Sequence, residues 1–170
     1  MSVEITRQGK ARKHPRLKEL QTAIRQSLET LYHALDLLDP ELSLVLTDDA
    51  HMSELNATWM GEEGPTDVLS FPLYDGEDFI EDMPALGDIV INVEYADRLV
   101  QTQDHRHRVA EELGVDVAEL RWSVVEEVVF LFIHGLLHLI GHDHGDPLQE
   151  TEMKSEERRL WESVAPLPHP

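Results

Sequence analysis

The longest apolar run in the sequence ends in the segment His134-Gly-Leu-Leu-His-Leu-Ile-Gly-His-Asp-His144. We expect this run to form a helix over residues 117–140. His134 and His138 are four residues apart, so on a helix they lie one turn apart on the same face. Two imidazoles placed in this way can bind one metal ion. The alternative, two histidines packed in the core, would bury polar groups without partners, which is unfavourable.

The residues that follow the two histidines predict a third ligand. Gly141 stands where the helix would stop, because glycine adopts the left-handed conformation at a helix end at little cost. The turn that it permits can bring His144 back over the end of the helix. Three neutral nitrogens with no fourth protein ligand are typical of a catalytic zinc site, in which water occupies the open position. The sequence therefore predicts one Zn²⁺ per chain on His134, His138 and His144.

The composition agrees with a histidine-based metal site in a single domain. The chain has 170 residues and no cysteine, so disulfides and thiolate ligands are excluded and His, Asp or Glu must hold any transition metal. One domain over residues 1–170 is expected from this length. The sequence shows no signal peptide and no apolar run of membrane-spanning length. We therefore expect a cytoplasmic protein without a membrane partner.

Charge is distributed unevenly along the chain. The net charge of −20 argues against broad adhesion to nucleic acid, and no DNA partner is expected. Residues 1–25, however, contain seven basic and two acidic residues, which gives +5 there and −25 elsewhere. This basic segment could meet an anionic partner. A solvated helix face with its leading arm explains it equally well.

The remaining patterns predict an α+β fold, with a small mixed sheet covered by about five helices. Leucine and isoleucine recur at spacings of three and four from Leu17 to Leu38, which is typical of an amphipathic helix. The acidic, turn-rich residues 75–82 are expected to form a loop. Short apolar segments predict strands over residues 3–6, 42–47, 67–73 and 86–93, and the other helices are expected over residues 48–59, 94–113 and 149–164.

Three motifs resemble the YbeY family of ribosomal RNA maturation factors. They are the segment from His134 to His144, the segment Pro65-Thr-Asp-Val-Leu-Ser-Phe-Pro72 with Leu55-Asn56 before it, and Leu86-Gly-Asp-Ile-Val-Ile91. They occur in the family's order. The resemblance implies an α+β fold, zinc on the three histidines, and a metal-dependent endoribonuclease. It also implies a role in processing ribosomal RNA ends and in ribosome quality control, with ribosomal RNA and ribosome-associated proteins as partners.

The sequence departs from the family pattern at two positions. The family usually has an arginine in a Tyr-Arg-Gly segment, where this chain has Trp59-Met60-Gly61. Methionine cannot bind phosphate or neutralise charge in a transition state, as guanidinium can. Either another basic residue replaces it, with Arg98 and Arg121 as candidates, or the activity is weaker than the family resemblance implies. His142 stands where the family often has tyrosine, which adds a further potential ligand.

The leading hypothesis is that zinc on the three histidines promotes attack on an RNA phosphodiester. Asp88 and Asp143 are the candidate catalytic carboxylates, with turn or strand-end roles as the alternative. A zinc peptidase is the second hypothesis, since the histidine spacing is that of metzincins, but Gly135 replaces their catalytic glutamate. A non-catalytic zinc-bearing protein of the ribosome is the third. A fourth protein ligand would favour it.

Overall fold

The structure is a computed structural model that describes residues 3–74 and 83–168. The predicted acidic loop at 75–82 lies outside the described residues. Strands and helices follow one another along the chain as β1 (Val3–Arg7), η1 (Gly9–Lys13), α1 (Leu17–Ala34), β2 (Glu41–Thr47), α2 (Asp49–Leu55), η2 (Asn56–Met60), β3 (Val68–Pro72), β4 (Ala85–Asn92), α3 (Val93–Leu99), α4 (Gln103–Leu113), η4 (Val117–Glu119), α5 (Val124–Leu139) and α6 (Pro147–Val164).

The described strands form one mixed sheet in the order β1-β2-β4-β3. β1, β2 and β4 run parallel, and β3 pairs with β4 in the antiparallel direction. β3 therefore lies at an edge, which suits Pro72 because proline cannot donate a ladder hydrogen bond. The predicted α+β fold with a small mixed sheet is confirmed.

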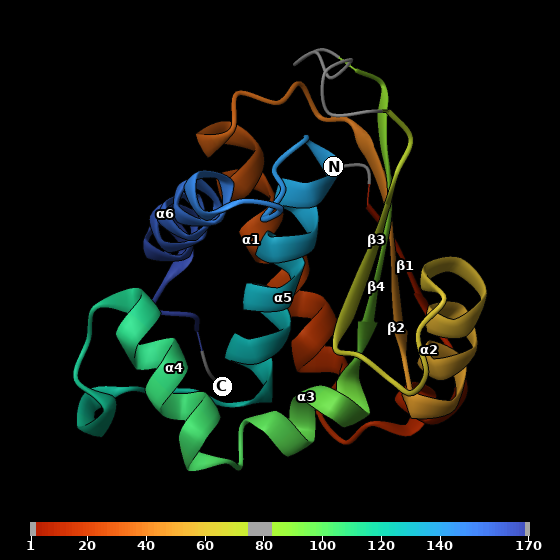
Figure 1. Ribbon diagram of the computed structural model, residues 1–170, viewed down its shortest axis with the longest axis horizontal. Coiled ribbons are helices and arrows are strands. Elements are labelled where there is room, and N and C mark those ends of the chain that lie inside the picture. Colours follow the sequence, from red (N-terminus) through yellow and green to blue (C-terminus); the bar gives the residue numbers. More distant parts are fainter. Residues whose placement is uncertain (1–2, 75–82, 169–170) are drawn as a thin grey trace.

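Helices cover the two faces of the sheet unequally (Figure 1). On one face lie α1, α5 and α6, whose apolar side chains join those of β2 and β4 in the main core. Gly135 lets α5 approach the sheet closely, because a Cβ at this position would lie 2.9 Å from Cγ2 of Ile89. On the other face, α2 covers a smaller cluster of Met52, Leu69 and Val90. The buried helix α5 is thus the central element of the fold.

Two of the predicted helices differ most from the structure. The helix expected over residues 94–113 is divided into α3 and α4, because Thr102 interrupts it and caps α4 by accepting a hydrogen bond from the backbone N–H of His105. The helix expected from residue 117 begins at Val124, where Ser123 and Glu126 form a capping box. No helix in the described part of the chain has the length and hydrophobicity that a transmembrane span requires.

Candidate metal centre

Three histidines meet at the C-terminal end of α5. His134 and His138 project from the helix, and His144 comes from the turn that follows it. One nitrogen from each imidazole can be chosen so that all three lie within 4.8 Å of one another. Among the described residues, this is the one group of three or more His, Asp or Glu side chains arranged to hold a metal ion.

The hydrogen bonds of the first two histidines direct their other nitrogens toward a shared point. Nδ1 of His134 lies 2.7 Å from Oε1 of Glu157, and Nδ1 of His138 lies 2.9 Å from the carbonyl oxygen of His142. Both acceptors require Nδ1 to carry the proton, so each neutral ring has its lone pair on Nε2. The two Nε2 atoms are 3.1 Å apart, close to the separation of about 3.4 Å expected for two zinc ligands in a tetrahedron. The donor set therefore fits a zinc ion.

Burial favours the neutral form of His138. Desolvation lowers the pKa of this imidazole, and the neighbouring His134 lowers it further. A neutral imidazole is the form that binds metal, since the ligating nitrogen must have a free lone pair. His138 is thus prepared for ligation near neutral pH.

Local sequence explains how the third histidine reaches the other two. Gly141 has φ of +103°, a region that side chains rarely adopt, and it ends α5 in a sharp turn. Asp143 then accepts a hydrogen bond of 2.8 Å from the backbone N–H of His144 and holds the turn. Asp146 caps α6, which begins with Pro147. This turn returns the chain along α5, so that Glu157 on α6 meets His134.

A cleft of about 380 Å³ extends from the histidines between α4, α5 and α6. His134 and His144 are part of its wall. The cleft also contains the cationic side chains of Arg108 and Lys154 and several carboxylates, among them Glu112 and Glu157. A substrate that approaches the histidines through this cleft would meet both cations.

Glu112 differs from the other carboxylates in the cleft. Its pKa is raised to about 8. Burial is the largest cause, and the charge of the nearby Glu157 and a hydrogen bond with it also contribute. Glu112 therefore carries a proton at neutral pH and shares it with the same carboxylate that holds His134.

The raised pKa of Glu112 predicts a pH-dependent stability. The folded metal-free chain keeps this proton up to about pH 8, whereas the unfolded chain releases it above about pH 4.5. Stability is therefore lost as pH rises between these values. We expect the free energy of unfolding of Glu112→Gln, minus that of wild type, to become more positive from pH 5 to pH 8. Urea denaturation with a chelator present measures both free energies. The control is Glu111→Gln, which changes an exposed carboxylate. If the difference between Glu112→Gln and wild type does not change with pH, the raised pKa of Glu112 is contradicted.

Comparisons with known proteins show the family to which the chain belongs. The family model described as Endoribonuclease YbeY matches residues 4–165. The chain belongs to the endoribonuclease YbeY family. It is 36% identical over 161 residues to Endoribonuclease YbeY of Clavibacter sepedonicus, which covers 90% of this chain and 88% of the relative. It is 40% identical over 130 residues to that of Heliobacterium modesticaldum, with coverages of 72% and 68%.

A solved structure shows the same fold. The solution structure of TM1509 from Thermotoga maritima aligns with a TM-score of 0.55 at 24% identity, covering 95% of this chain and 88% of that one. The predicted membership in the YbeY family, and with it the enzyme class, is therefore confirmed by family model and relatives.

The structure separates the two carboxylates that the sequence suggested. Asp143 lies in the histidine turn, where it holds the backbone of His144. Asp88 is exposed on β4, and because neighbouring residues of a strand point to opposite faces, it lies on the face opposite to Ile89 and α5. The candidate catalytic carboxylate Asp88 therefore lies on the face of the sheet away from the histidines. His142 contributes its carbonyl oxygen, and its ring is outside the three-histidine group.

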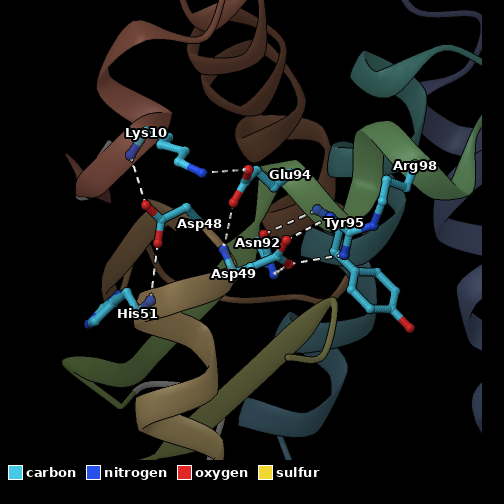
Figure 2. Close-up of polar contacts among 8 residues, drawn as sticks. All are labelled: Lys10, Asp48, Asp49, His51, Asn92, Glu94, Tyr95 and Arg98. Carbon is cyan, nitrogen blue, oxygen red and sulfur yellow. Dashed lines mark hydrogen bonds and ion pairs between the residues drawn. The ribbon is translucent and has the colours of Figure 1, made fainter. Parts of the chain in front are cut away.

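The arginines proposed to compensate for Met60 also lie elsewhere. Arg98 forms a two-pronged ion pair with Asp49, with distances of 2.6 and 3.0 Å, at the other end of the sheet (Figure 2). Arg121 faces a different cavity, beside Trp161. Met60 itself is exposed, at the end of η2. In this YbeY-family chain, Arg108 is the arginine in the wall of the cleft.

Four residues of the site were missed at the sequence level: Arg108, Glu112, Lys154 and Glu157. They belong to α4 and α6, which meet α5 only in the folded chain. Glu157 lies four residues after Met153 and three before Leu160, which are both buried. This spacing places Glu157 on the inner face of α6. A carboxylate on that face was a signal that could have been used.

Proposed function

We propose that the protein is a zinc-dependent endoribonuclease that acts in the maturation of ribosomal RNA ends and in ribosome quality control. The observation that carries this proposal is a group of three histidines, with no fourth donor grouped with them in the described part of the chain, beside a cleft that contains two cations. Membership in the YbeY family supports it. Ribosomal RNA and ribosome-associated proteins are the proposed partners, in the cytoplasm.

His134, His138 and His144 would hold the zinc ion, one per chain. Bound zinc supplies a Lewis acid and lowers the pKa of water at the open position. Glu157 orients His134 through Nδ1, as carboxylates commonly do for metal-binding histidines. Arg108 and Lys154 would contact the phosphates of the RNA, since guanidinium and ammonium groups stabilise phosphoryl charge.

The two alternative functions fit the site less well. A metzincin-like peptidase needs a glutamate in place of Gly135, but this position is pressed against Ile89 and has no room for a side chain. A structural zinc would normally have four protein ligands. Within the described residues, only three are grouped. Catalysis on RNA is therefore preferred.

Replacing Arg108 by alanine tests the role of the cleft. We expect zinc content to be unchanged and cleavage of single-stranded RNA to fall at least about tenfold, or about 1.4 kcal/mol of transition-state stabilisation. The matched control is Arg121→Ala, which removes an equally exposed arginine outside the cleft and should retain wild-type cleavage. Equal rates for the two variants would show that substrate does not use this cleft.

The ribosomal role needs a test in cells. If the proposal is correct, cells whose only copy of the protein is the His138→Ala variant should accumulate ribosomal RNA with unprocessed ends. Normal ends in such cells would remove the ribosomal part of the proposal.

A further inference from the structure

The basic segment near the N-terminus forms a fixed, exposed surface. We call Arg7, Arg12, Lys13 and Lys18 the N-terminal basic surface. All four side chains belong to exposed residues at the end of β1, in η1 and in the first turn of α1, which packs against η1. Nε of Arg12 donates a hydrogen bond of 3.1 Å to the backbone carbonyl oxygen of Arg7, which holds the Arg12 side chain against the end of β1.

Three carboxylates near this segment, those of Glu19, Asp48 and Glu94, are engaged with other groups. Lys10 pairs with Glu94 at 3.4 Å, and Arg16 pairs with Glu19 at 2.8 Å. Asp48 accepts backbone hydrogen bonds. Across residues 3–74 and 83–168, no ion pair involves any of the four cations of the N-terminal basic surface. Their charge is therefore available to a partner.

Backbone contacts anchor the segment that bears these cations. The N–H of Gln8 donates to the carbonyl of Leu46 at 2.9 Å, and the N–H of Lys10 donates to Oδ2 of Asp48 at 2.9 Å (Figure 2). Ala11 is fully buried. Gly9 has φ of +58°, and a Cβ there would lie 2.1 Å from Oδ2 of Asp48, so this close approach requires glycine. The cations are thus presented by a rigid backbone.

The N-terminal basic surface is separate from the metal centre. None of its residues is part of the wall of the cleft beside His134. In Figure 1 the red segment that follows β1 lies at the lower end of the sheet, whereas the turn after α5 lies at the upper end. On a chain with a net charge of −20, a local group of cations that form no ion pair with other described residues is where a polyanion can approach.

We propose that the N-terminal basic surface binds the phosphate backbone of single-stranded RNA, as an anchor for long substrates outside the catalytic cleft. The choice of RNA as the polyanion rests on the proposed endoribonuclease function. Four phosphate contacts on a single strand correspond to a slope of about −2.8 for log K against log salt concentration. Contacts of this kind favour long RNA without selecting its sequence.

The test is binding of a long single-stranded RNA, measured by fluorescence anisotropy over a range of salt concentrations, with the length of the RNA checked on a gel after each measurement. The variant Arg7→Gln/Arg12→Gln/Lys13→Gln should bind about tenfold more weakly, and its salt slope should be smaller by about 2. The control Arg121→Gln/Arg158→Gln/Arg159→Gln removes the same charge elsewhere and should bind like wild type. Melting curves establish that both variants are folded.

Cleavage of a trinucleotide tests the proposed function separately from the anchor. A trinucleotide is too short to reach from the metal centre to the N-terminal basic surface. Weaker binding of long RNA only in the first variant supports the anchor, whether or not trinucleotide is cleaved. Three results would overturn the anchor proposal. They are equal binding of long RNA by wild type and both variants, an equal loss of binding in both variants, and no binding by wild type. If the trinucleotide is cleaved by wild type in those cases, the enzyme assignment still holds.

Discussion

His138→Ala is expected to lose bound zinc, from about one ion per chain to none, and to lose RNA cleavage with it. The substitution leaves two histidines, one of them on an exposed turn, and removes the Nε2 atom that faces His134 at 3.1 Å. Two ligands do not complete the three-histidine set of a catalytic zinc site. Metal content of the purified variant, measured by elemental analysis beside an RNA cleavage assay, checks both parts.

The matched control for His138→Ala is His142→Ala. His142 lies in the same turn but supplies only its carbonyl oxygen to His138, and this backbone atom survives the substitution. We expect His142→Ala to keep its zinc. Full occupancy in His138→Ala, or loss of metal in His142→Ala, would mean that the ligands have been assigned incorrectly.

Glu157→Ala is expected to lower zinc affinity by about 10–100-fold, the usual effect of removing the partner of a metal-binding histidine. Glu157 is 4% exposed, and its Oε1 accepts the Nδ1 proton of His134. Without it, His134 is free to rotate or to change tautomer, and the metal loses the nearby negative charge. Glu157→Gln should show a smaller loss, because an amide oxygen can still accept the proton. Competition with a chelator of known affinity measures both.

A control on the same helix separates this effect from a general loss of charge. Glu152 is an exposed carboxylate of α6, and Glu152→Ala should bind zinc as wild type does. Denaturation of the metal-free variants shows whether α6 remains packed. If Glu157→Ala folds normally and binds zinc with unchanged affinity, Glu157 has no positioning role.

Features that depend on local sequence were predictable. The spacing of His134 and His138 and the turn at Gly141 are within one helix and its end, so periodicity and glycine geometry were sufficient to bring the three histidines together. Apolar periodicity likewise identified the strands and most helices. The division at Thr102 was missed because a single capping residue interrupts a pattern that otherwise continues.

Features that depend on packing between distant segments were not predictable in the same way. Glu112 and Arg108 reach the cleft because α4 lies beside α5 and α6, and no spacing in the sequence encodes that arrangement. Asp88 is a different case. The period-two alternation of β4 could have shown that Asp88 and Ile89 face opposite sides, had the buried side of the strand been assigned first.

The bond between His134 and Glu157 joins residues 23 positions apart, on helices made one after the other. During synthesis on the ribosome, all three histidines leave the exit tunnel before α6 does. A metal ion that arrives at that stage meets a His134 whose Nδ1 proton has no partner. Full affinity must wait until α6 docks, so capture of the ion follows the packing of α6 against α5.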